Sequence, residues 1–353
     1  MASGKRVSVI VHGPEAVDTG LASDIIGRAS SLGEVRAAVG GTTAVAAVID
    51  AGLELIIDIS SRELPSAAIK RASSSSDLIL LVNQGKDRDS SIAFGRLVMS
   101  KVSVSIPVVQ LEAGMSILWA GQDRDLEPFQ PLLKGELLDL RKESRSEVDG
   151  VRVLSGVHPG ENIWINGHVI GKADDTKVVI RQTTEGSLVA EGVRTKSTGI
   201  ERLGHFDLRT AIIRSGQVRR TRAQPRCLVS EGTAVCLIDH CAEESLFLCR
   251  DAAFVVTVGD DTSKIASALL YRLGVPVIAI TDGDEDGISF EELLYPGSYL
   301  FRLAPGNDDQ VGAEIARDFF PEGHRVKMKM NIEEMAAKVR AACGERLLWE
   351  RRF

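Results

Sequence analysis

Three aspartates spaced two apart follow an apolar run of strand length in Val275–Gly287, VPVIAITDGDEDG. The run predicts a buried β-strand, which places the aspartates in the loop that follows it. Ligands gather at the carboxyl ends of strands in open α/β sheets, and carboxylate oxygens are ligands that Mg²⁺ prefers. We therefore expect Asp282 and Asp284 to hold one Mg²⁺, with Asp286 as a third ligand. The alternative is an ordinary Asp-Gly turn that needs no metal.

A second acidic candidate, Glu231, ends the short apolar segment RCLVSEG, and a run of arginines leads into it. Guanidinium groups bind phosphate through two parallel hydrogen bonds. The sequence therefore predicts an anion site beside the metal site, and its alternative is a solvated edge. The arginines of this run are Arg214, Arg219, Arg220, Arg222 and Arg226, of which Arg219, Arg220 and Arg222 are the predicted anion-binding residues.

Residues 226–320 resemble the Toprim domain of topoisomerases, bacterial primases and related nucleases. The resemblance rests on a strand ending in Glu-Gly (RCLVSEG), then helix and strand, then an apolar strand ending in Asp-x-Asp (ITDGDEDG). It implies that Glu231 is a general acid/base and that Asp282 and Asp284 bind Mg²⁺. The segment TAVCLIDHCAEESLFLC stays open between one long helix and a strand that ends at Asp239. The strand interpretation weakens the match of Glu231.

The whole chain also resembles an uncharacterised protein family of methanogenic archaea. The segments that carry this resemblance are VHGPEAVDTG, GGTTAVAAVIDAGLE, VGDDTS and ITDGDEDG. It implies an archaeal cytoplasm and a shared three-part layout, and it supplies no catalytic residues.

Length and composition set limits on the class of protein. A chain of 353 residues is too long for one ordinary core, and 44% hydrophobic residues support buried cores. The run of about 18 apolar residues that a membrane span needs is missing, so we expect a cytoplasmic protein with no membrane partner. The five cysteines form no CxxC pair, which favours neither a disulfide framework nor a zinc site.

Apolar runs of strand length alternate with helical segments through residues 1–118, which predicts a Rossmann-like or flavodoxin-like doubly wound α/β domain. The nucleotide fingerprints GxGxxG and GxxxxGK[ST] are absent. Three loops at predicted strand ends can still cradle an anion: residues 12–15, 40–43 and 83–86. Gly41, Thr42 and Lys86 are the predicted anion-binding residues there, and plain helix capping is the alternative for the threonine.

The rest of the chain divides by changes of pattern. Residues 119–150 read as a charged helical linker, and residues 151–225 have a period of two with Gly, Asn and Asp turns, which predicts a small β module. The module is basic, whereas the whole chain has a net charge of −7. Residues 226–330 are expected to form the α/β domain that resembles Toprim, and residues 331–353 are expected to be a terminal amphipathic helix.

Two functions from different classes follow. The first is a Mg²⁺-dependent transfer or hydrolysis at a phosphodiester or phosphoanhydride, with a phosphate-bearing small molecule or a nucleic acid as substrate. The second is a non-catalytic regulatory or partner protein that binds a nucleotide or a small acid. The sequence leaves the substrate, the pathway and the oligomeric state open.

Overall fold

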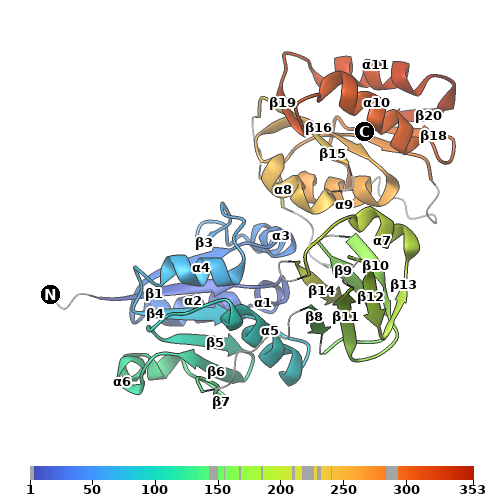
Figure 1. Cartoon of the computed structure of the whole chain (residues 1–353). Coiled ribbons are helices and arrows are strands. Elements are labelled where there is room, and N and C mark those ends of the chain that lie inside the picture. The colour runs from blue at the N-terminus through green and yellow to red at the C-terminus, as the bar shows by residue number, and fades with distance from the viewer. Residues whose placement is uncertain are drawn as a thin grey trace. The chain divides into compact units, whose positions relative to one another are not determined.

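The computed structural model describes residues 4–142, 150–154, 156–166, 168–183, 186–208, 211–216, 226–228, 232–239, 241–283 and 293–353 (Figure 1). The chain falls into two compact units, Met1–Arg222 and Ala223–Phe353. Both units contain parallel strands connected by helices, which confirms the predicted α/β class. Among the described residues, no helix is long and apolar enough to cross a membrane.

A seven-stranded sheet opens the first unit, in the order β3-β2-β1-β4-β5-β6-β7. Its strands are β1 (Lys5–Val11), β2 (Gly33–Val39), β3 (Ile57–Asp58), β4 (Leu78–Val82), β5 (Val108–Glu112), β6 (Met115–Ala120) and β7 (Glu136–Asp139). β1 to β5 pair in parallel. The order 3-2-1-4-5 is that of a doubly wound sheet whose switch point lies between β1 and β4.

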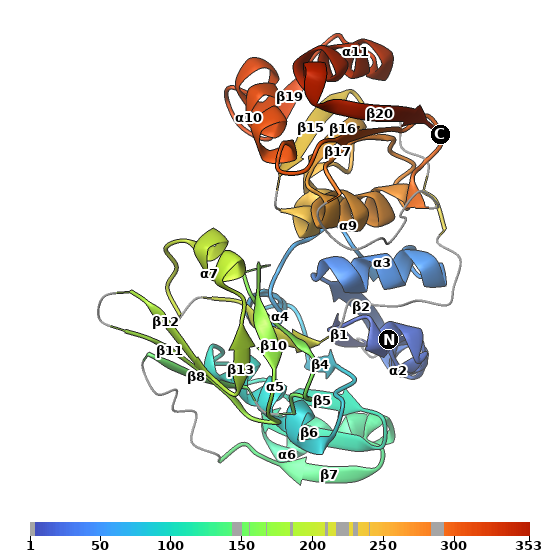
Figure 2. The ribbon, with the colours of Figure 1, turned by 90° about the vertical axis from the view of Figure 1, so that its right-hand side faces the viewer.

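Helices cover both faces of this sheet, which is why β4 is an unbroken apolar run. They are α1 (Glu15–Asp18), α2 (Leu21–Ser30), α3 (Thr42–Ala51), α4 (Pro65–Ala72), α5 (Arg88–Ser100), α6 (Asp123–Leu126) and the 3₁₀-helix η1 (Glu127–Leu132). Residues of α4 and α5 share one core with Ile79 and Leu81 of β4. Figure 2 shows α2 and α3 on one side of the sheet and α4 and α5 on the other.

The expected helical linker at residues 119–150 is wrong over much of its length, because this segment extends the sheet. β6 runs to Ala120, and β7 pairs with it in parallel. Leu138 and Leu140 pack against the core on the α4 and α5 side, whereas Leu137 is exposed. The alternation of inward and outward side chains is the period of a strand, and the high charge of the segment concealed it.

The predicted small β module is confirmed. Its elements are β8 (Val151–Leu154), β9 (Asn162–Ile165), β10 (His168–Ala173), β11 (Val178–Gln182), β12 (Leu188–Glu191), β13 (Val193–Thr195), α7 (Ser197–Leu203) and β14 (Ile213–Gly216). They form two antiparallel sheets, β13-β10-β9-β14 and β12-β11-β8. Ile163, Ile165, Ile170 and Ile180 from both sheets fill one core.

The second unit is built on a six-stranded sheet in the order β19-β15-β16-β17-β18-β20. The strands are β15 (Ala234–Asp239), β16 (Ala252–Val258), β17 (Val277–Thr281), β18 (Tyr299–Leu303), β19 (Arg325–Lys327) and β20 (Leu347–Arg352). β15 to β18 pair in parallel, and the two edge strands are antiparallel. The open segment at residues 234–239 is thus a strand.

The main helices of the second unit are α8 (Ser245–Leu248), α9 (Asp260–Tyr271), α10 (Asp308–Phe319) and α11 (Ile332–Cys343), with the 3₁₀-turns η2 (Ala242–Glu244) and η4 (Gly344–Arg346). Figure 1 shows α8 and α9 on one side of the sheet and α10 and α11 on the other. The expected terminal helix is correct only as far as Cys343. Gly344, with a positive φ of 53°, ends it, and β20 then joins the sheet beside β18.

Candidate functional sites

Three neighbouring strands of the first sheet end at adjacent positions. Val11 of β1 pairs with Val82 of β4, which pairs with Leu111 of β5. The ladder continues one residue further, because the His12 amide donates to the Val82 carbonyl at 2.8 Å and the Asn83 amide to the Leu111 carbonyl at 3.2 Å. His12, Asn83 and Glu112 therefore stand in one row at the carboxyl edge, at the switch point between β1 and β4.

Hydrogen bonds join the side chains of this row. Asn83 Nδ2 donates to Glu112 Oε1 at 2.7 Å, and Asn83 Oδ1 lies 2.9 Å from His12 Nδ1. Because the amide nitrogen of Asn83 is used on Glu112, its oxygen faces His12 and must accept. Nδ1 of His12 therefore carries the proton, and in the neutral ring Nε2 carries the lone pair.

The Glu112 carboxylate is buried and accepts from three donors. Besides Asn83, they are Gln110 Nε2 at 2.6 Å and the Gly85 amide at 2.8 Å. Trp119 Nε1 donates to Gln110 Oε1 at 3.0 Å, which fixes the orientation of that amide. A Cβ on Gly95 of α5 would lie 2.1 Å from Gln110 Oε1, so only glycine allows the helix to close over the network. Buried polar groups are stable when satisfied in this way.

The imidazole of His12 stacks on Phe94 of α5, with ring centroids 4.1 Å apart and planes 18° apart. Burial lowers the pKa of His12 below its usual value, because desolvation penalises the charged ring, and the hydrogen bond to Asn83 opposes this only in part. The ring is therefore neutral at pH 7. A neutral histidine with a fixed tautomer offers one lone pair, which accepts a hydrogen bond or a proton.

The predicted anion-binding residues of the first domain lie at the same edge but differ in setting. Gly41 is the N-cap of α3 and Thr42 its first residue, with no side-chain cap, and a Cβ on Gly41 would meet nothing within 4 Å. Their role stays a prediction. Lys86 instead donates to three acceptors in the β module, so its anion role would require the ion pair with Glu161, 2.5 Å long, to open.

At the carboxyl edge of the second sheet, Asp282 follows β17 directly and is buried. Its Oδ2 accepts from the Gly306 amide. Asp308 begins α10, and its carboxyl group hydrogen-bonds to Asp282. Burial, followed by the charges of Asp282 and Asp309, raises the pKa of Asp308 to about 6. A carboxyl group whose pKa is raised by burial and by neighbouring carboxylates is common at functional sites and also in structural networks.

Asp260, the first residue of α9, is held by a cation. Its Oδ1 accepts from Arg302 at 3.0 Å, and its Oδ2 accepts from the Gly283 amide at 2.7 Å. Gly283 has a φ of 76°, and a Cβ there would lie 2.5 Å from the guanidinium, so Arg302 packs on bare backbone. Within the described part of the chain, no group of three His, Cys, Asp or Glu side chains could hold a metal ion.

Several predicted site residues fall outside the described residues, and their roles stay predictions. They are Glu231, Asp284, Asp286, Arg219, Arg220 and Arg222. Of the expected Mg²⁺ ligands the structure describes Asp282. Because residues 234–239 form a strand, the match of Glu231 to the Toprim pattern is weakened. β15 also brings Asp239 to the edge that carries Asp282.

Sequence reasoning singled out the loops of His12 and Asn83 but missed their connection to Glu112. The signal was present in all three strands: VIVH, LLVN and VVQLE each place a polar side chain directly at the end of an apolar run. Only the order of the strands tells which of these ends are neighbours.

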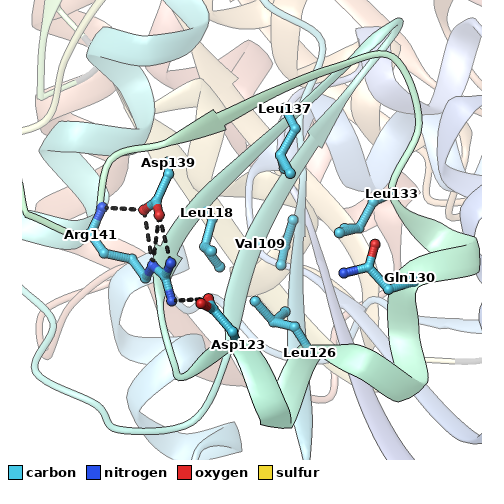
Figure 3. A pocket seen from close by; sticks show the side chains of 9 residues that line it. All are labelled: Val109, Leu118, Asp123, Leu126, Gln130, Leu133, Leu137, Asp139 and Arg141. Carbon is cyan, nitrogen blue, oxygen red and sulfur yellow. Dashed lines mark hydrogen bonds and ion pairs between the residues drawn. The ribbon is translucent and has the colours of Figure 1, made fainter.

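A cavity of about 290 Å³ lies between the end of the first sheet and the segment α6–η1 (Figure 3). Its walls are apolar, from Val109, Leu118, Leu126, Leu133 and Leu137. The charged groups at its rim bind one another, because Arg141 donates to Asp139 at 2.6 Å and to Asp123 at 2.8 Å. It supplies space but no reactive group.

Comparison with known proteins identifies the family of the chain, and the match covers the carboxyl edges of both sheets. Residues 9–323 match the family described as "Uncharacterized protein conserved in archaea (DUF2117)". The chain belongs to this family. An uncharacterized protein of the methanogen Methanocaldococcus jannaschii is 32% identical over 332 residues, which cover 89% of this chain and 91% of the relative. No solved structure matches the chain. The predicted membership of an archaeal family is thus confirmed, and the matched span includes His12, Glu112, Asp282 and Asp308.

Proposed function

We propose that the N-terminal domain, which is the part of the first unit that contains the seven-stranded sheet (residues 5–139), binds a small molecule, a nucleotide or a small acid. The binding site is the carboxyl edge of β1, β4 and β5. In this proposal Nε2 of His12 accepts a hydrogen bond or a proton from the ligand. The observation that carries it is the row His12–Asn83–Glu112, which stands at the point where doubly wound sheets bind their ligands.

The row supports this chemistry because it prepares the ring before a ligand arrives. Asn83 holds the Nδ1 proton, so Nε2 is the basic atom, and the lowered pKa keeps it unprotonated at pH 7. When Nε2 takes up a proton, the Asn83 carbonyl dipole and the Glu112 charge behind it stabilise the cation. An anionic group of the same ligand would meet the start of α3 at Gly41, since β2 is the next strand.

The test is a thermal-shift and calorimetry panel of nucleotides, sugar phosphates and small carboxylic acids on the full chain. His12→Asn keeps a donor toward Asn83 and removes the Nε2 lone pair. We expect at least one compound class to bind, about tenfold more weakly to His12→Asn, because one lost hydrogen bond costs about 1–1.5 kcal/mol. His205→Asn, at an exposed histidine of the β module, is the control. Equal binding by His12→Asn would refute the role of His12.

A second candidate function is Mg²⁺-dependent hydrolysis of a phosphodiester or phosphoanhydride at the edge of the second sheet. The observation that favours it is the carboxyl pair Asp282–Asp308, because a bound cation would offset the neighbouring charges that help to raise the pKa of Asp308. Mg²⁺ supplies polarisation of phosphorus and activation of water. Arg219, Arg220 and Arg222 remain the predicted contacts for the phosphate groups of a small molecule or a nucleic acid, and Glu231 would act as the base that the Toprim resemblance implies.

Replacing Glu231 by Gln tests this second candidate, because Gln keeps the shape and removes the proton acceptor. We expect the variant to bind Mg²⁺ and substrate normally and to lose turnover by a factor of about 10² or more. A Mg²⁺-dependent hydrolysis that Glu231→Gln leaves within a factor of about two would disprove this mechanism.

We also propose that the protein works in the cytoplasm. The support is the state of its cysteines: Cys236, Cys249 and Cys343 are buried free thiols, which persist where the surroundings are reducing.

A further inference from the structure

The β module contacts the N-terminal domain at the loop between β4 and α5. Lys86 Nζ donates to Glu161 Oε2 at 2.5 Å, to Ser215 Oγ at 3.1 Å and to the Gly156 carbonyl at 3.4 Å. Gly156 has a φ of 70°, and a Cβ there would lie 2.4 Å from the Cβ of Ser90. The backbone of the module therefore packs directly on the first turn of α5.

The same loop builds the ligand site. Asn83 and Gly85 supply two of the three donors that hold Glu112, and Asn83 also orients His12. Lys86 is the next residue along the chain. Four consecutive residues, 83 to 86, therefore connect the polar row to the module, and a short loop held at both ends has little freedom to move.

The contact is stronger than a surface ion pair. The Glu161 side chain is only 10% exposed and also accepts from the His158 amide at 3.2 Å. A charge-assisted bond in such a setting is short and strong, and losing one partner leaves the other charge buried. On the N-terminal side, Asp87 and Ser90 form a capping box that fixes the start of α5. Both ends of the contact are thus rigid.

We propose that the β module positions the ligand site of the N-terminal domain, and that Lys86 is the positioning residue. By binding Glu161, Lys86 holds the loop Asn83–Asp87 so that Asn83 spans His12 and Glu112. Release of the module loosens the loop, and His12 loses its fixed tautomer and orientation. The effect on ligands rests on the proposed function of the N-terminal site, whereas the effect on the loop does not.

The experiment measures the loop without any ligand. The amide of Gly85 donates to Glu112. Its hydrogen exchange, followed by NMR on the full chain, therefore reports how often this hydrogen bond opens. Lys86→Met keeps the length of the side chain and removes the ammonium. We expect exchange at Gly85 to be at least about tenfold faster in Lys86→Met and in Glu161→Gln, and the His12 titration midpoint to move up toward 6.5.

Arg88→Met is the matched control. Arg88 is the first residue of α5, two positions after Lys86, and its ion pair with Glu136 at 3.1 Å stays inside the N-terminal domain. Exchange at Gly85 should be unchanged. Glu161→Gln keeps a hydrogen-bond acceptor, so it covers the case in which Lys86→Met fails to fold. Exchange at Gly85 that stays at the wild-type rate in a folded variant overturns the proposal, whatever the ligand panel shows. Faster exchange supports it even if no compound binds, and in that case only the proposed function fails.

Discussion

Both units place polar side chains at the carboxyl edge of the parallel strands of a sheet. They differ in how the charges of these side chains are balanced. In the first, donors and acceptors alternate from His12 through Asn83 to Glu112, and the ring is neutral. In the second, Asp308 hydrogen-bonds to Asp282 and its pKa is raised to about 6, while Arg302 pairs with Asp260. The carboxyl edge of the first sheet is ordered before a ligand arrives, whereas at the second edge we expect a bound cation to reduce the repulsion between carboxylates.

The largest expected effect would break the ordered edge. Glu112→Ala removes the acceptor of two buried donors and one half-buried donor, and a buried donor costs about 1–3 kcal/mol when unpaired. We expect a loss of about 3–5 kcal/mol in the free energy of unfolding, measured with urea. Glu136→Ala, at an exposed ion pair, should lose less than about 1 kcal/mol. Equal losses in the two variants would contradict a satisfied network at Glu112.

The next effect concerns the pair of carboxyl groups. The pKa of Asp308 is about 6 in the folded protein, against 3.8 for an ordinary aspartate. The stability that protonated Asp308 contributes is therefore fully present below pH 3.8 and is lost as the pH rises through about 6. Asp308→Asn stays neutral. After allowance for solvent screening, we expect the free energy of unfolding of Asp308→Asn to be about 1–2 kcal/mol higher than that of the wild type at pH 7. Near pH 3.5 the two values should be equal.

Urea unfolding at several pH values checks this prediction for Asp308. Asp318→Asn, at an exposed aspartate on the same helix, is the control and should show no such trend. A constant difference between Asp308→Asn and the wild type from pH 3.5 to pH 8 would contradict the raised pKa of Asp308.

A smaller effect would sharpen the contrast between the edges. Mg²⁺ at about ten times its Kd should stabilise the wild type by about 1.4 kcal/mol, or about 2–4 °C in Tm. The double variant Asp282→Asn/Asp308→Asn should lose this shift, whereas Glu112→Gln should keep it. Thermal unfolding with and without Mg²⁺ measures the shift in Tm. The same shift in the double variant would show that Mg²⁺ does not bind at this edge.

The smallest effect is the pH dependence of the ordered edge. Since burial lowers the pKa of His12, the unfolded chain takes up a proton near 6.5 before the folded one does. The His12 contribution is therefore fully present above 6.5 and declines as pH falls below it. His12→Asn should flatten this part of the stability curve, and NMR titration of His12 should give a midpoint below 6.5. A midpoint above 6.5 would mean that the ring is exposed or paired with a charge.

Much of the fold could be predicted from the sequence. Both wrong predictions concern edge strands, β7 of the first sheet and β20 of the second. Continuous apolar runs such as Leu78–Val82 show a strand that is buried on both faces, and period two showed the β module. The high charge of residues 136–139 masks the alternation and favours a helix, whereas the structure has a strand there. β20 was missed because edge strands are half exposed and gain their stability from pairing with β18.

The sequence by itself determined that polar residues stand directly after buried strands, because the end of an apolar run and the type of the next residue are local facts. Tertiary structure decided which ends meet. His12 and Asn83 are 71 residues apart and touch because β1 and β4 pair in the centre of the sheet. Strand order and register arise from long-range packing and hydrogen bonding, which the period of a single strand does not encode.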